Sequence, residues 1–266
     1  MGEFVELSGK LIRESGLRQT TSSLWWRGQS DATWPLIPTL YRSAINSEME
    51  RELIRDFKLR SLPFLGPTLP SKNIEWLFLM QHHGAPTRIL DWSESPLIAL
   101  YFCLARFDYE NEGAVWALNP WVLNIATTGQ QLTPTVSSPT IKDYVIDFDD
   151  PSVPRAPKAE LPIAVRIEYG FNRAHSQRGA ATIHGYRKRP IEGLRSSVAT
   201  AKMSRTRQQK FLFKIHIDGM RKFDMLKSLY EYGIGADTLF PDLDGLSSAL
   251  RFRYDHRYLG TKLDRQ

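Results

Sequence analysis

Three clusters of polar residues stand in strongly apolar surroundings, and each holds side chains that could bind a ligand or take part in a reaction. The first is Trp26-Arg27-Gly28. An arginine at the end of an aromatic strand is costly to bury unless it meets an anion, and the glycine beside it lets a ligand approach the backbone closely. The alternative is that Arg27 forms a structural ion pair with Asp31 or Asp91.

The second cluster occupies residues 81–88 and continues through residues 90–96. It places histidine, threonine, arginine, aspartate and serine immediately before a long apolar run. A turn of this kind offers hydroxyls, free amides and a helix N-terminus, all of which suit phosphate or ribose oxygens. Helix capping accounts for one of the serines but not for the whole set.

The third cluster consists of Arg173, His175, Gln177 and Gly179, and it opens a strongly basic stretch. Glu192 is the acidic residue of that stretch, and its ten basic residues are Arg173, Arg178, Arg187, Lys188, Arg189, Arg195, Lys202, Arg205, Arg207 and Lys210. The whole chain has a net charge of +6. Such clustering is typical of a surface that binds phosphate backbones, and the alternative is a solvated surface loop.

Hydrophobic periodicity and cap residues predict the elements that position these clusters. Strands are expected at 23–29, 113–119, 163–169, 179–184 and 211–217, and helices at 47–59, 73–82, 93–107, 222–232 and 243–254. Ser47 is expected to cap the helix at 47–59, and Ser93 or Ser95 the apolar helix after the second cluster. Residues 127–162, rich in Pro, Ser, Thr and Asp, predict an irregular insert or lid. Strands and helices do not alternate regularly, which predicts an α+β fold.

The composition is that of a globular domain. Of the 266 residues, 42% are hydrophobic and 24% charged, which excludes disordered, collagen-like and coiled-coil classes. The length fits one large domain over 1–266. No apolar run reaches the roughly 20 residues of a membrane helix, and the start shows no signal-peptide pattern, so we expect a cytoplasmic chain without a membrane partner.

Neither thiol chemistry nor a metal site is expected. The single cysteine, Cys103, lies inside the apolar run and is expected to be an inert core thiol. The adjacent His82 and His83 do not share a helix face, and no third ligand stands at a usable spacing, so metal binding is not expected.

Four stretches of the chain resemble the FRG domain family. They are WWRGQSDATWPLIPTLYR, QHHGAPTRILDWSESPLIALYFCLA, GAVWAL and IGADTLFPDLDGL. The family takes its name from a Phe-Arg-Gly motif, for which this chain has Trp26-Arg27-Gly28. The resemblance runs from about Leu24 to Leu246, and QHHGAPTRILDW is a long and highly specific part of it.

A more distant resemblance is to ADP-ribosyltransferases of the Arg–Ser–Glu class. It implies a split mixed β-sheet core with flanking helices, and NAD as the substrate. Arg27 is similar to the arginine that holds a phosphate of NAD. Ser93 and Ser95 are similar to the serine motif that braces the strand clasping the nicotinamide ribose.

The third motif of that class is a glutamate, and here the chain departs from the pattern. The motif falls near residues 177–179, where the chain has Gln177 and no Glu-x-Glu. A glutamine can hydrogen-bond a ribose hydroxyl, but it supplies neither a negative charge nor a base. Asp91, Glu94 and Glu168 are the other candidates for the carboxylate.

Three functions follow as hypotheses. The first is an NAD-dependent ADP-ribosyltransferase that modifies nucleic acid, with RNA favoured over DNA. The FRG resemblance implies this activity, because some members of that family have been linked to toxins of antiphage systems that ADP-ribosylate nucleic acid. It also implies a possible antitoxin partner. The second is a non-catalytic module that binds a nucleotide or nucleic acid, and the third is a protein-interaction subunit without affinity for NAD.

The first hypothesis assigns roles to individual residues. Its catalytic residues are Arg27, Ser93, Gln177 and Asp91. Its NAD-binding residues are Arg27, Gly28, Gln29, His83, Gly84, Thr87, Arg88, Trp92, Ser93 and Ser95, of which Trp92 would stack. Its nucleic-acid-binding residues are Arg187, Lys188, Arg189, Lys202, Arg205 and Arg207.

Overall fold

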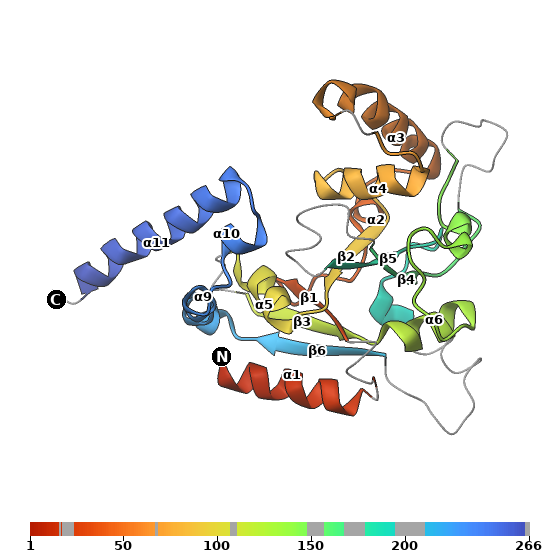
Figure 1. Ribbon diagram of the computed structural model, residues 1–266. Coiled ribbons are helices and arrows are strands. Elements are labelled where there is room, and N and C mark those ends of the chain that lie inside the picture. The colour runs from red at the N-terminus through yellow and green to blue at the C-terminus, as the bar shows by residue number, and fades with distance from the viewer. Residues whose placement is uncertain are drawn as a thin grey trace.

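The computed structural model describes residues 1–15, 17, 24–66, 69–106, 111–147, 157–167, 179–194 and 211–263. These residues form an α+β fold in which helices flank a six-stranded antiparallel sheet (Figure 1), which confirms the predicted class. The strands are β1 (Trp25–Gln29), β2 (Ile89–Ser93), β3 (Gly113–Leu118), β4 (Ile163–Arg166), β5 (Gly179–Ile183) and β6 (Leu212–Ile217). The α-helices are α1 (Gly2–Glu14), α2 (Thr39–Arg42), α3 (Ser47–Ser61), α4 (Asn73–His82), α5 (Pro96–Leu104), α6 (Pro120–Thr128), α9 (Lys222–Glu231), α10 (Ala236–Leu239) and α11 (Leu243–Leu263). Short 3-10 helices are η1 (Leu62–Phe64), η2 (Pro139–Asp143), η3 (Ile191–Leu194) and η4 (Gly219–Arg221).

The sheet is joined at its centre by a single registered pair. The strand order is β4-β5-β2-β1-β3-β6. All five residues of β1 pair with β3, and all five residues of β2 pair with β5. Between these two halves, β1 and β2 share only the pair Trp26↔Ser93. The two central strands therefore diverge on one side of that pair, which leaves room for a cleft between them.

Helix α5 packs directly on β1. A Cβ atom at Gly28 would lie 1.9 Å from the carbonyl oxygen of Ala99 and 2.5 Å from the amide nitrogen of Cys103. We expected Gly28 to admit a ligand, but the helix backbone takes up this space. Cys103 is buried and burial raises the pKa of its thiol to about 12, as expected of an inert core cysteine.

Helices α3 and α4 cover the other half of the sheet, beside β2 and β5 (Figure 1). Ile54 of α3, Leu77 and Met80 of α4, and Ile89 and Ile183 of the strands belong to one buried cluster. This cluster fixes α4, and with it the start of the second polar cluster, against β2.

Most predicted elements are present, with shifted ends. Helix α4 has the predicted bounds. Asn46, not Ser47, caps α3, because its side chain accepts hydrogen bonds from the amides of Glu48 and Met49. The apolar helix begins at Pro96 with Ser95 as its N-cap, whereas Ser93 ends strand β2. Of the two caps that the sequence allowed, Ser95 is confirmed and Ser93 was wrong, and the helix expected over 93–107 begins three residues later.

Four of the described α-helices were not predicted, namely α1, α2, α6 and α10. Helix α1 precedes β1, and α6 occupies Pro120–Thr128, immediately before the irregular insert expected at 127–162 and overlapping its first two residues. Asn119 caps α6 through the amide of Val122, and Pro120 suits its first position. Within the described part of the insert, Ile141 and Tyr144 are buried against the α3–α4 cluster, so this part belongs to the core.

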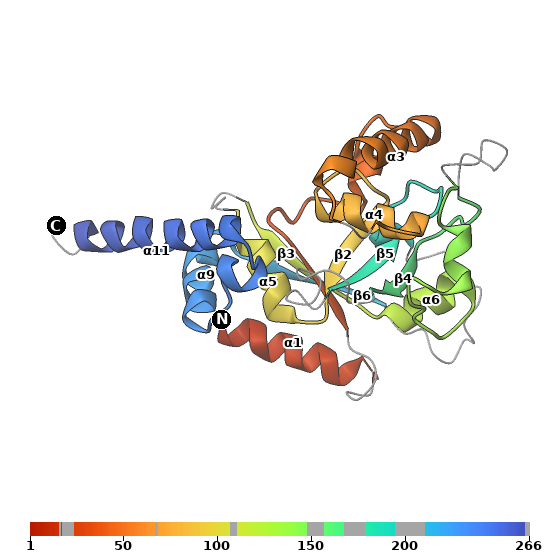
Figure 2. The same ribbon diagram turned by 45° about the horizontal axis from the view of Figure 1, so that its top comes forward.

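The last helix extends away from the sheet in both views (Figures 1 and 2). The predicted end was residue 254, but α11 continues to Leu263. Its first half packs on α10 and α9, where the ring of Phe252 stacks on Tyr230 with centroids 4.2 Å apart. Over the described residues, no helix is both long and apolar enough to span a membrane.

Candidate functional site

A cleft of about 680 Å³ opens where β1 and β2 diverge. One wall carries residues from β1, the loop after it and α5, and the other carries residues from α4, β2 and β5. Its described lining is Trp26, Arg27, Gly28, Gln29, Ser30, Trp34, Pro35, Ile37, Arg42, Phe78, Gln81, His82, Asp91, Trp92, Ser93, Phe102, Ala105, Arg106, Ile167, Gly179, Ala180 and Phe240. This size and this mixture of aromatic and polar groups are typical of small-molecule sites.

Arg27 lies between the two walls. Its Nη1 donates to the backbone carbonyl oxygen of Asp91, 2.6 Å away. Its Nε is buried and has no hydrogen-bond partner among the described residues. Burial lowers the pKa of Arg27; Asp91 opposes that shift and the neighbouring cation Arg42 adds to it. A cation held in this way, with an unmet donor, is suited to bind an anion.

Asp91 is held in the cleft by two neighbouring side chains. Gln81 donates from Nε2 to the Asp91 carboxylate, and Thr87 donates its hydroxyl to the amide oxygen of Gln81. Thr87 in turn accepts from the amide of Ile89, 3.2 Å away. The hydroxyl of Thr87 thereby orients the Gln81 amide, whose NH₂ group faces the carboxylate.

Among the described residues that line the cleft, Asp91 is the only one with a carboxylate side chain. Its side chain is exposed to the cleft, but protein atoms surround it on the remaining sides. This desolvation raises the pKa of Asp91 above its usual value, while Arg27 and the hydrogen bond from Gln81 oppose the shift. The site therefore places one carboxyl beside a guanidinium whose Nε has no partner among the described residues.

Ser93 and Ser95 differ in their contacts and in their position relative to the cleft. Ser93 is buried at the cleft and its hydroxyl accepts from the amide of Ser95, 3.1 Å away. The hydroxyl of Ser95 accepts from the amide of Ile98 at 3.5 Å and caps α5. Ser93 thus reaches the cleft, whereas Ser95 fixes the helix behind it.

Comparison with known proteins finds a similarity for part of the chain. Residues 22–112 match the family model of the FRG domain. This part of the chain is therefore similar to the FRG domain family. The matched residues include β1, α4, β2 and α5, and therefore Arg27, Gln81, Asp91 and Ser93. No curated protein and no solved structure matches the chain.

Three of the residues that we expected to bind NAD are engaged in structural contacts within the protein. Gln29 accepts from the indole Nε1 of Trp116 at 2.7 Å and donates to the carbonyl of Pro35 at 3.3 Å. Trp92 is 3% exposed and donates Nε1–H to Thr182 at 3.1 Å, so it is not free to stack. Thr87 is buried, and it contacts Gln81 and not the open cleft.

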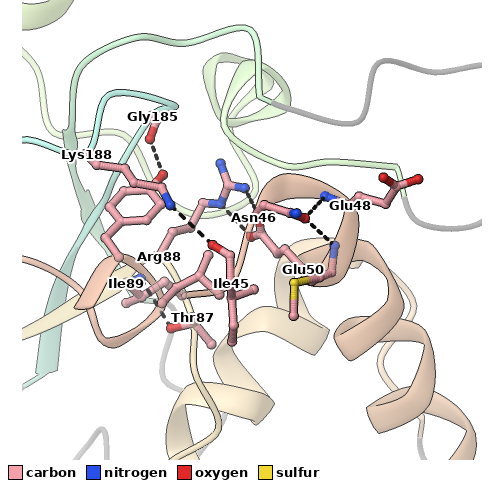
Figure 3. Close-up of polar contacts among 12 residues, drawn as sticks. Ile45, Asn46, Glu48, Glu50, Thr87, Arg88, Ile89, Gly185 and Lys188 are labelled. Atoms are coloured by element: carbon pink, nitrogen blue, oxygen red, sulfur yellow. Dashed lines mark hydrogen bonds and ion pairs between the residues drawn. The ribbon is translucent and has the colours of Figure 1, made fainter. Parts of the chain in front are cut away.

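Arg88 is also committed to a structural contact (Figure 3). It is 2% exposed and forms a two-pronged ion pair with Glu50 of α3, with Nε 2.8 Å from one carboxylate oxygen. This pair joins α3 to the start of β2. The structure therefore places Arg88 in the core and not at a ligand.

The histidines at the end of α4 differ in position. His82 lines the cleft, whereas His83 is exposed at the helix end with its ring 4.9 Å from that of His82. Gly84 is also exposed and has φ of 76°, the left-handed conformation that ends the helix. Among the described residues, no group of three His, Cys, Asp or Glu side chains gathers to hold a metal ion.

The basic stretch is described only in part. Arg187 pairs with Glu160, and Lys188 donates to the carbonyl of Ile45 at 3.2 Å and lies over the ring of Tyr41. Arg189 is exposed. These residues follow Ile183, at the opposite end of β5 from the cleft residue Gly179. The predicted residues Gln177, Glu168, Lys202, Arg205 and Arg207 lie outside the described residues.

The cleft also contains residues to which the sequence analysis gave no role. Arg42 of α2, Trp34 of the loop after β1, and Arg106 after α5 all line it. Trp34 and Arg42 lie in the WWRGQSDATWPLIPTLYR stretch, so the family motif was a signal for them. Arg106 follows an apolar helix and carried no such signal.

Proposed function

We propose that this protein is an NAD-dependent ADP-ribosyltransferase that modifies nucleic acid, with RNA favoured over DNA. The observation that carries the proposal is the position of Arg27 beside Asp91 at the point where β1 and β2 diverge, with Arg27 bonded to the backbone of Asp91. A guanidinium with an unsatisfied buried donor suits the pyrophosphate of NAD. A carboxylate beside it suits the cationic sugar that forms when the nicotinamide bond breaks.

The reaction replaces one bond at the anomeric carbon of the nicotinamide ribose with another. Nicotinamide leaves with the bonding electron pair, and the sugar carbon becomes positively charged. An oxygen or nitrogen of the target nucleotide then attacks this carbon and loses its proton. In this mechanism Arg27 holds the pyrophosphate, Ser93 supports the ribose side, and Asp91 stabilises the sugar cation.

Asp91 supplies the negative charge that the Arg–Ser–Glu class obtains from its glutamate. Gln81 donates to its carboxylate and stabilises the ionised form, which the mechanism needs. The raised pKa of Asp91 explains why such a donor is useful, because desolvation alone favours the neutral acid. Gln177 remains a candidate for contact with a ribose hydroxyl.

We place this activity in a toxin of an antiphage system, as the FRG resemblance implies, with an antitoxin as its natural restraint. The basic residues 187–189 support a polyanionic target, because Arg189 is exposed and belongs to a chain with net charge +6. The non-catalytic module, which binds nucleotide without turnover, is the second candidate, since Gln177 replaces the glutamate of the class.

The test is transfer of label from NAD. The protein is incubated with NAD labelled in the adenylate moiety, together with separate RNA, DNA and protein fractions. We expect label on RNA with the wild-type protein and none with Arg27→Ala or Asp91→Asn. NAD binding without transfer to any fraction supports the module, and the absence of NAD binding refutes the transferase.

A further inference from the structure

Of the described tryptophans that line the cleft, Trp34 is the one open to solvent. Trp34 is 36% exposed, whereas Trp26 and Trp92 are 1% and 3% exposed. An indole at a cleft wall offers a large planar surface for another ring at little entropic cost, because it has two rotatable bonds. Trp34 is therefore the residue of this set that a planar ligand can reach.

The loop that presents Trp34 is fixed on both sides. The carbonyl of Ala32 accepts from Nζ of Lys214 at 2.6 Å, and the carbonyl of Pro35 accepts from Nε2 of Gln29 at 3.3 Å. Both donors belong to strands of the central sheet. A ligand that contacts Trp34 consequently loses little free energy in ordering this loop.

A cation lies over this indole. The guanidinium carbon of Arg106 is 5.9 Å from the centre of the Trp34 ring. Arg106 is exposed, and no carboxylate pairs with it among the described residues. Phe102 and Phe240, with ring centroids 6.0 Å apart, also line the cleft. Aromatic rings and guanidinium planes are the groups on which proteins stack nucleobases.

We propose that Trp34 and Arg106 form a subsite for the purine base of a dinucleotide, with the base held between indole and guanidinium. Two stacked contacts of about 3.5 Å each need about 7 Å, so Arg106 moves outward by only about 1 Å from its present place. The identity of the dinucleotide as NAD rests on the proposed function. Its pyrophosphate would then lie at Arg27, and its nicotinamide ribose on the β2 side near Asp91.

Binding of NAD and its two halves tests this subsite. Calorimetry measures the affinities of NAD, ADP and nicotinamide mononucleotide for the wild-type protein, Trp34→Ala, Trp34→Phe and Tyr232→Ala. Trp34→Ala should weaken NAD and ADP about tenfold or more, as expected when one stacking partner is removed, and leave nicotinamide mononucleotide unchanged. Trp34→Phe should restore most of the affinity. Tyr232, which is 76% exposed and outside the described cleft lining, is the control.

The outcomes separate this inference from the proposed function. If Trp34→Ala weakens nicotinamide mononucleotide as much as ADP, or weakens neither, the base subsite is wrong even where NAD binds. If the wild-type protein binds ADP through Trp34 but does not bind NAD, the base subsite holds and the transferase proposal fails. If the wild-type protein binds none of the three ligands, both are wrong.

Discussion

The guanidinium of Arg27 reaches across the gap between the two central strands and donates to the backbone carbonyl of Asp91, 2.6 Å away. Past the pair Trp26↔Ser93, this bond joins β1 to β2 at the mouth of the cleft. It uses the backbone oxygen of Asp91 and leaves both carboxylate oxygens to other partners. The sequence left open an ion pair between these two residues. The structure shows instead a bond to the backbone, which leaves the Nε of Arg27 and the carboxylate of Asp91 unpaired with each other.

Arg27→Ala should abolish binding of NAD while the fold is retained. Burial lowers the pKa of Arg27, which means that the folded protein bears a cost for this cation. Its removal should therefore change the melting temperature little. Arg27→Lys should also fail to bind, because a lysine lacks the planar fork that holds two phosphate oxygens. Calorimetry with NAD and thermal unfolding measure the two effects, and loss of folding in Arg27→Ala would make Arg27 a structural residue.

Arg88→Met should have the opposite effect, with a large loss of stability. The substitution leaves the carboxylate of Glu50 buried without its partner, which typically costs about 3–5 kcal/mol. The double variant Glu50→Met/Arg88→Met should recover much of this loss, because it removes both buried charges. Urea unfolding of the three proteins measures the differences. A stable Arg88→Met protein that no longer binds NAD would return Arg88 to the ligand site.

Gln81→Leu should shift the pH dependence of label transfer. The hydrogen bond from Gln81 lowers the pKa of Asp91, so its removal raises that pKa further. Because the mechanism needs the ionised carboxylate, the acid limb of the kcat profile should move to higher pH with little change in KM for NAD. Thr87→Val should give a smaller shift in the same direction.

The other charged groups at the cleft set the control for this shift. Arg27, Arg42 and Arg106 also line the cleft, and arginine is not the side chain type that changes charge in such a profile. His82 of α4 lines it too, and histidine is the side chain type that commonly changes charge in this range. The profile is therefore repeated in the His82→Asn background. If the acid limb stays in place on loss of Gln81 in both backgrounds, Gln81 does not position the catalytic carboxylate.

The sequence predicted well those elements that are apolar runs bounded by glycine, proline or polar residues. Helix α4 has the expected bounds, and strands β1, β3, β4, β5 and β6 lie close to their expected places. Helix α6 was missed because its short apolar run stands between the strand expected at 113–119 and the insert expected at 127–162, and was assigned to neither, although Asn119-Pro120 is a cap followed by a first-turn proline. The divergence of β1 from β2 has no local signal, because it arises from which strands pair.

The site was predictable to the extent that its residues share one motif. Arg27, Asp91 and Ser93 were expected near a ligand, and all three line the cleft. Arg88 stands in the same motif, but its partner Glu50 lies in another helix, and the pattern cannot tell a core ion pair from a ligand contact. Arg106 enters the cleft because α5 packs on Gly28, a relationship that only the tertiary structure reveals.

Neutralising Arg187, Lys188 and Arg189 together should weaken nucleic-acid binding and leave NAD affinity unchanged. Each phosphate contact that the substitutions remove should reduce the log–log salt slope by about 0.9 for duplex or about 0.7 for single strands. Arg187 already pairs with Glu160. We therefore expect the salt slope to fall by an amount that corresponds to fewer than three phosphate contacts. A variant with Lys227, Arg251 and Arg253 neutralised has the same charge change elsewhere on the molecule. Equal weakening in both variants would show a general charge effect, and an unchanged slope would make residues 187–189 ordinary surface.

His184 should make the protein sensitive to mild acid. Its side chain is 0% exposed, and neither ring nitrogen has a hydrogen-bond partner among the described residues. Burial, together with the nearby cations Arg88 and Arg27, lowers its pKa to about 3. In the unfolded chain this histidine binds a proton near pH 6.5, whereas in the folded protein it stays neutral until the pH approaches 3. The free energy of unfolding therefore has its full value above pH 6.5 and decreases progressively as the pH falls towards 3.

His184→Phe tests this dependence. A phenyl ring keeps the edge-on contact with Tyr41, whose ring centroid lies 6.2 Å from that of His184. At pH 7 the variant should be at least as stable as the wild type, because it removes two unsatisfied buried nitrogens. Between pH 7 and 4.5 its free energy of unfolding should fall by about 2–3 kcal/mol less than that of the wild type. Urea unfolding at several pH values measures both curves, and parallel curves would mean that His184 is already protonated, or paired, in the folded protein.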